Sequence, residues 1–85
     1  MAAQFSQPPT LRELVERARH YGFTKRSTRV PESGERFVYL KRVRGRTIDL
    51  VDLPPNKENE RLTRAVAEGL CKKLGIPLED FGLGP

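Results

Sequence analysis

The sequence predicts a small α+β domain with the element order α-β-β-β-α, in which two helices cover one face of a three-stranded antiparallel sheet. Three features lead to this prediction. Apolar residues recur at helical spacing near both ends of the chain, β-branched and aromatic residues dominate residues 23–53, and turn signals divide that segment into three parts. With 85 residues the chain is too short for two independent cores. We therefore expect one domain over residues 10–82, between a flexible arm (1–9) and a short tail (83–85).

The first helix is predicted over residues 11–21. Thr10 and Glu13 have the spacing of a capping box, in which the hydroxyl accepts from the Glu N–H and the carboxylate reaches back. Gly22 stands where a helix often ends in a left-handed residue. One apolar stripe has the spacing of a helix that packs on one side, and it consists of Leu11, Leu14, Val15 and Ala18.

Three strands are predicted over residues 23–30, 35–42 and 47–53. Pro31–Gly34 has the composition of a turn, and Arg44–Gly45 indicates a tight hairpin connection. Connections this short imply that consecutive strands are antiparallel neighbours. Two prolines follow Leu53 and end the sheet, because proline cannot donate to a strand ladder.

Alternate side chains of the second strand point to opposite faces, so Phe37 and Tyr39 share one face and Val38 and Leu40 share the other. Both faces are thus partly apolar. We expect Phe37 in the core. Two roles stay open for Tyr39, either a core residue or an exposed platform for a base.

The second helix is expected to begin near residues 56–60, with Asn56 or Asn59 as its N-cap. Gly75 and Pro77 indicate its end, and residues 78–81 form a further turn that tucks Phe81 under the helix. Its helical spacing is carried by Leu62, Ala65, Val66, Gly69, Leu70 and Leu74.

The net charge of +5 is unevenly distributed along the chain. Residues 1–48 carry 11 basic and 4 acidic side chains, for a net +7, whereas residues 49–85 carry 5 and 7, for a net −2. Cations on neighbouring strands attract a polyanion such as a nucleic acid. They can also simply protect exposed strand edges from aggregation. The basic residues of the predicted sheet are Lys25, Arg26, Arg29, Arg36, Lys41, Arg42, Arg44 and Arg46.

Several site classes find little support in the composition. One Cys excludes a disulfide framework within the chain, and with one His it leaves few ligands for zinc. We expect Cys71 to be a buried hydrophobic residue and His20 to lie on the surface at the end of the first helix. We expect no metal and no cofactor, because an acidic run near a helix N-terminus is usually solvated; that run consists of Asp49, Asp52, Glu58 and Glu60.

No apolar run approaches the roughly 18 residues that a membrane span needs. The first residues also lack the basic and apolar regions of a signal peptide. We therefore expect a cytoplasmic protein without a membrane partner.

Short motifs follow one another in a characteristic order: Gly22-Phe23, Gly34-Glu35-Arg36 with Tyr39 three residues on, Leu53-Pro54, Leu62-Thr63…Leu70…Leu74-Gly75-Ile76, and Glu79-Asp80-Phe81. In order and spacing they resemble the HicA-type mRNA interferases, the small toxins of bacterial toxin–antitoxin pairs. The resemblance covers roughly residues 10–82. It implies a fold similar to the double-stranded-RNA-binding domain.

The sequence departs from that family at one position. The family's second strand typically opens Gly-Ser-His with a catalytic His, and Arg36 stands at the matching position here. An arginine stays protonated and cannot act as a base, and Glu35 is a weak base at neutral pH. The resemblance thus implies RNA binding with weak or no ribonuclease activity. Any remaining cleavage would be that of a metal-independent endoribonuclease.

Two functions of different class stay open. The first is RNA binding, with cations on phosphates and an aromatic ring on a sugar or base, through Arg26, Arg36, Tyr39, Lys41, Arg42, Arg44 and Arg46. The second is a protein-interaction module that binds an acidic antitoxin or host protein through the same basic surface.

Overall fold

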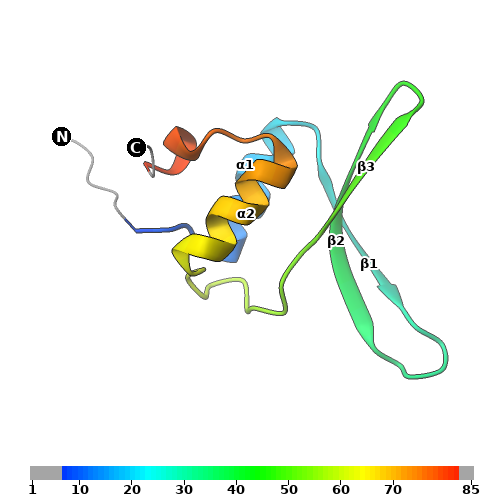
Figure 1. The fold of residues 1–85 in the computed structure, drawn as a ribbon. Coiled ribbons are helices and arrows are strands. Elements are labelled where there is room, and N and C mark those ends of the chain that lie inside the picture. Colours follow the sequence, from blue (N-terminus) through cyan, green and yellow to red (C-terminus); the bar gives the residue numbers. More distant parts are fainter. Residues whose placement is uncertain (1–6, 83–85) are drawn as a thin grey trace.

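The computed structural model describes residues 7–82 and has the predicted order of elements (Figure 1). The elements are α1 (Leu11–His20), β1 (Thr24–Arg29), β2 (Arg36–Arg44), β3 (Thr47–Asp52), α2 (Arg64–Leu74) and the short 3₁₀ helix η1 (Leu78–Phe81). The α-β-β-β-α prediction is confirmed. Residues 1–6 of the predicted arm and the predicted tail over 83–85 lie outside the described residues.

Helix α1 begins with the predicted capping box. The Glu13 N–H donates to the Thr10 hydroxyl at 3.1 Å, and the Thr10 N–H donates to the Glu13 carboxylate at 2.9 Å. The helix ends at His20 with Tyr21 as its C-cap, and Gly22 follows with a φ of +93°, a conformation that favours glycine. The predicted stripe, Leu11, Leu14, Val15 and Ala18, is buried.

The sheet is an antiparallel meander in the order β1-β2-β3. Residues 30–35 connect β1 to β2, and Gly45 and Arg46 form the two-residue turn between β2 and β3. The φ of Gly45 is +59°, as the tight hairpin turn requires.

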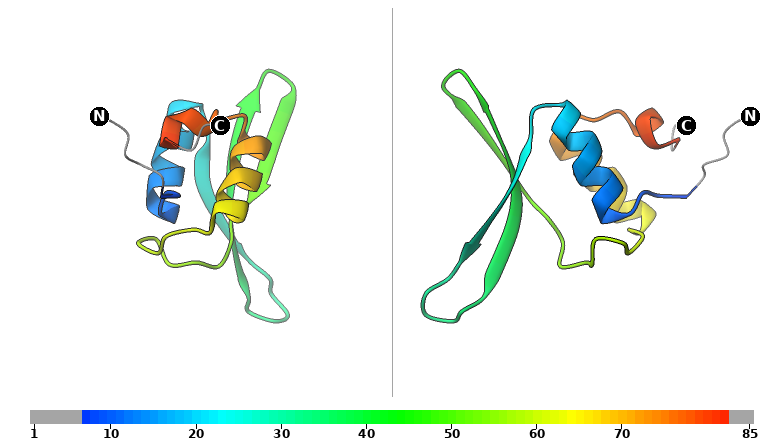
Figure 2. Two further views of the ribbon diagram at one scale, coloured as in Figure 1. Left: turned by 60° about the vertical axis from the view of Figure 1, so that its left-hand side comes forward. Right: turned by 180° about the vertical axis from the view of Figure 1, so that it is seen from behind.

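Both helices pack against the middle of one face of the sheet, and the two hairpin ends extend past them (Figure 2). Leu40 and Val51 are cross-strand partners on that face, and only 0% and 5% of their surfaces are exposed. Every residue of β1 is exposed, as expected for a polar edge strand. The helices supply most of the remaining core, which includes Leu14, Ala18, Ala67, Leu70 and Leu74.

The predicted start of the second helix is wrong. Its N-cap is Thr63, whose hydroxyl accepts from the Val66 N–H at 3.2 Å, and neither Asn56 nor Asn59 caps it. The preceding segment stays outside the helix and turns at residues 58–60, because its backbone is bonded to the start of α1. The Glu58 carbonyl accepts from the Arg12 N–H at 2.9 Å, and the Leu62 N–H donates to the Pro9 carbonyl at 3.0 Å.

The C-terminal end of α2 follows the prediction. Gly75 is left-handed, with a φ of +75°, and Ile76 is buried behind it. Residues 78–81 form η1, which packs Phe81 against the core. The Tyr21 hydroxyl donates to the Asp80 carboxylate at 2.7 Å and so joins the end of α1 to η1. Within residues 7–82 no helix is both long and apolar enough to cross a bilayer.

Candidate nucleic-acid interface

The sheet divides six of the seven predicted site residues between its two faces. Side chains alternate along a strand, and cross-strand partners share a face. The face toward the helices, the helix-side face, carries Arg36, Arg42 and Arg44 together with the buried Leu40. The opposite face, the outer face, carries Arg26, Tyr39 and Lys41. Arg46 lies in the turn between β2 and β3.

Two of the predicted cations are held by one carboxylate. The Nε of Arg42 and the Nε of Arg44 lie 3.0 and 3.1 Å from the same Asp49 oxygen. Arg42 also donates to the Tyr21 carbonyl at 3.1 Å, and its guanidinium stacks 4.3 Å from the centre of the Phe23 ring. Arg42 therefore joins the sheet to the end of α1.

The outer face brings three of the predicted residues together. Arg26 and Tyr39 are direct cross-strand partners, and Lys41 is two residues along β2 from Tyr39. Among the ion pairs between described residues, none involves Arg26 or Lys41. Tyr39 is half-buried, so its ring borders this face without belonging to the core.

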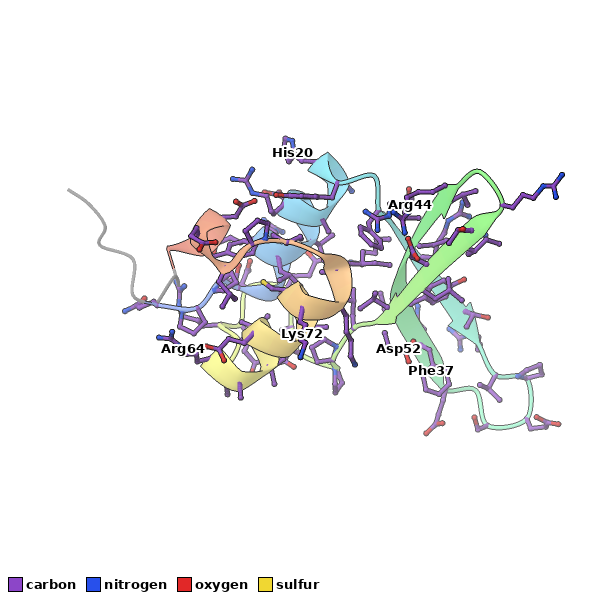
Figure 3. All side chains as sticks on the ribbon, turned by 45° about the horizontal axis from the view of Figure 1, so that its top comes forward. His20, Phe37, Arg44, Asp52, Arg64 and Lys72 are labelled. Carbon is purple, nitrogen blue, oxygen red and sulfur yellow. The ribbon has the colours of Figure 1, made fainter. Side chains whose placement is uncertain are left out.

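Phe37 also lies on the outer face, so the prediction that it belongs to the core is wrong. Half of its surface (50%) is exposed. It lies two residues before Tyr39 on the outer face, opposite Thr28, and both helices lie on the other face of the sheet (Figure 2). Periodicity alone could not identify the covered face, because β2 carries apolar side chains on both faces. Figure 3 shows Phe37 and Arg44 toward opposite ends of the sheet.

An aliphatic patch continues the outer face toward the β2–β3 turn. Val43 and Ile48 are cross-strand partners that are 60% and 57% exposed, and Leu50 is 61% exposed. Asp52 supplies an acidic group on this face, opposite Tyr39 on the side away from Arg26. The outer face is thus more apolar than the basic composition suggests.

Arg36 is separated from the other predicted residues of its face. Its direct cross-strand partner is Arg29, at the end of the β1–β2 ladder. Its NH2 group lies 3.4 Å from the Ser27 hydroxyl. Arg29 is one of the basic residues of the predicted sheet but not one of the seven predicted site residues. The register of the hairpin places it here, and sequence patterns alone do not determine that register.

The remaining candidates lie away from both surfaces. His20 is exposed at the end of α1, on the helical side of the molecule (Figure 3). Cys71 is 1% exposed, as predicted, and burial raises the pKa of its thiol, with smaller contributions from Asp80 and Glu68. No group of three or more metal-ligating side chains gathers within the described part of the chain.

Two acidic residues of the predicted run have basic partners. Asp49 binds Arg42 and Arg44. Glu58 accepts from Lys25 at 2.6 Å and from Arg12 at 3.4 Å, and these two cations, Lys25 foremost, lower the pKa of its carboxyl group. Two surface grooves, of about 840 and 480 Å³, are lined by none of the seven predicted site residues.

No protein-family model matches this sequence. Comparisons with characterised proteins and with solved structures also found no match. The resemblance to HicA-type interferases therefore stays a prediction.

Proposed function

We propose that the protein binds RNA through the outer face of its sheet, with unpaired bases stacked on aromatic rings and phosphates held by neighbouring cations. One observation carries this proposal. Phe37 and Tyr39 lie at alternate positions of the central strand, on a face that no described helix covers, beside the cations Arg26 and Lys41.

The spacing of the two aromatic rings suits single-stranded RNA. Residues i and i+2 of a strand are about 6.8 Å apart, so two rings on the central strand can each contact a separate base. Stacking of a base on an aromatic side chain contributes about 1–3 kcal/mol. Arg26 lies directly beside Tyr39, where its guanidinium can bind a backbone phosphate. The preference for RNA over DNA rests on the resemblance to the interferases.

We propose binding with weak or no cleavage. Arg36 stands where that family has its catalytic His, and it cannot accept a proton. His20 lies on α1, away from the outer face, and Cys71 is buried. Incubation with bulk mRNA is expected to leave the RNA intact. Cleavage that disappears in Arg36→Ala or His20→Ala would contradict this part of the proposal.

The binding experiment is a titration with fluorescent single-stranded RNA across a salt series. We expect the affinity to fall as salt rises, because phosphate binding releases counterions. Phe37→Ala should weaken binding about 5- to 150-fold at every salt concentration, the equivalent of one stacked base. Val66→Ala, which truncates a 39% exposed apolar residue on α2, is the matched control. An affinity that does not respond to salt would exclude a phosphate-led mode.

A protein-interaction module is the second candidate, and the aliphatic patch favours it. Val43, Ile48 and Leu50 cannot stack on bases as aromatic rings do, and exposed apolar patches often mark protein interfaces. The partner would be an acidic, antitoxin-like or host protein that pairs with Arg26 and Lys41. A short acidic protein encoded by an adjacent gene is the partner to test. Tight binding to it that is abolished in Ile48→Ser, without RNA binding by the wild type, would favour this function.

A further inference from the structure

Arg29 and Arg36 form a pair of like charges at the β1–β2 end of the sheet. They are direct cross-strand partners on the helix-side face. The Val30 N–H donates to the Glu35 carbonyl at 2.8 Å, so Arg29 and Arg36 occupy the next, non-hydrogen-bonded position of the ladder. Side chains at such positions start about 4.5–5.5 Å apart at Cβ, and like charges there destabilise a hairpin.

The other strand cations of this face have carboxylate partners. Lys25 pairs with Glu58, and Arg42 and Arg44 both pair with Asp49. No ion pair between described residues involves Arg29 or Arg36, although Glu32 and Glu35 stand in the adjoining turn. Arg36 reaches instead toward the neutral Ser27 hydroxyl, at 3.4 Å. Among the described residues, neither guanidinium group is within ion-pair distance of a carboxylate.

We infer that Arg29 and Arg36 form a binding site for a phosphate group. Two neighbouring guanidinium groups can each donate to an oxyanion, and the anion would cancel the repulsion between them. The Ser27 hydroxyl lies beside them as a further donor. All three residues are exposed, so a phosphate reaches the site without rearrangement of the sheet.

The phosphate belongs to the RNA that binds the outer face, and in this respect the inference rests on the proposed function. Phe37 and Arg36 are consecutive residues on opposite faces of β2. At this edge of the sheet β2 is bordered only by β1, and neighbouring strands are about 4.8 Å apart. A nucleic acid with one base on Phe37 can cross the β1 edge and place its next phosphates between Arg29 and Arg36.

The first test uses inorganic phosphate and the NMR signals of the arginine Nε–H groups at constant ionic strength. Phosphate should shift the Arg29 and Arg36 signals more than that of Arg19, an exposed arginine on α1, and chloride should not. In Arg36→Gln the Arg29 shift should disappear. Equal shifts at Arg19, Arg29 and Arg36 would overturn the site.

The second test identifies the source of the phosphate. The double variant Arg29→Gln/Arg36→Gln should lower the slope of log K against log salt for single-stranded RNA by about 0.7 for each phosphate that is no longer bound. The charge-matched control is Lys72→Gln/Lys73→Gln on α2. An unchanged slope, with binding still sensitive to Phe37→Ala, would overturn the inference and leave the proposed function standing. Phosphate shifts without any RNA binding would overturn the proposed function and the RNA source, but support the site.

Discussion

Arg42 and Asp49 face each other across β2 and β3, with the arginine Nε 3.0 Å from a carboxylate oxygen that Arg44 shares. Only 19% of the Arg42 side chain and 26% of the Asp49 side chain are exposed. Asp49→Asn should therefore lower the free energy of unfolding by about 1–3 kcal/mol, because it leaves a partly buried guanidinium without its counter-charge.

Chemical denaturation of Asp49→Asn and of the control Asp52→Asn checks this expectation. Asp52 is exposed on the outer face and takes part in no ion pair between described residues. Its substitution should change stability by no more than about 0.5 kcal/mol. Equal losses in the two variants would contradict the structural role of the Arg42–Asp49 pair.

The two faces of the sheet should respond differently to the same substitution. Leu40 is fully buried on the helix-side face, so Leu40→Ala should cost about 2–5 kcal/mol of stability. Leu50 is 61% exposed on the outer face, so Leu50→Ala should cost about 0.5 kcal/mol or less. Thermal and urea unfolding measure both. A loss for Leu50→Ala as large as that for Leu40→Ala would mean that the outer face is covered.

The ion pairs of Glu58 should make the stability of the protein depend on pH. Its carboxyl pKa is lowered in the folded protein from the ordinary 4.5, first by Lys25 and then by Arg12. Its contribution is therefore complete above about pH 4.5 and is lost as the pH falls through the folded-state pKa. Glu58→Gln should destabilise the protein at pH 7 and reduce the further loss on acidification. Urea unfolding at pH 7 and pH 3 measures the loss of unfolding free energy on acidification, with Glu32→Gln as the control. An equal loss in wild type and Glu58→Gln would contradict this linkage.

Arg36→Glu should separate binding from stability. It replaces a like-charge pair with an attractive one opposite Arg29, so it should stabilise the hairpin by about 0.2–1 kcal/mol. The same change should abolish the response to phosphate. Arg36→Gln, which removes only the repulsion, should fall between wild type and Arg36→Glu in melting temperature. A lower melting temperature for Arg36→Glu than for wild type would contradict this account.

The sequence predicts best the features that depend on neighbouring residues. Thr10 and Glu13 form the expected capping box, and Gly45 and Gly75 occupy left-handed positions at the turn and helix end. The start of α2 was predicted wrongly because residues far apart decide it. The carbonyl of Glu58 accepts from the Arg12 N–H at the start of α1, and this holds the segment before Thr63 out of the helix.

The site was predicted less well than the fold, for a physical reason. A run of basic residues in the sequence indicates the charge of a segment. It does not indicate which face of the sheet each side chain occupies, or which carboxylate lies opposite it on the neighbouring strand. Asp49 binds Arg42 and Arg44, whereas Arg29 and Arg36 face each other. Phe37 was predicted in the core because its exposure depends on where the helices pack, which β2 alone does not specify.

The bridge between Thr10 and Arg61 has a consequence for the folding pathway. Both hairpins close over a few residues, whereas the hydrogen bond of Arg61 to the Pro8 carbonyl joins positions 53 residues apart. Closing so long a loop costs entropy that the local hairpins avoid. The sheet is therefore expected to form early, and the segments around Pro8 and Arg61 are expected to join late. Weakening their junction should speed unfolding, with little effect on the folding rate.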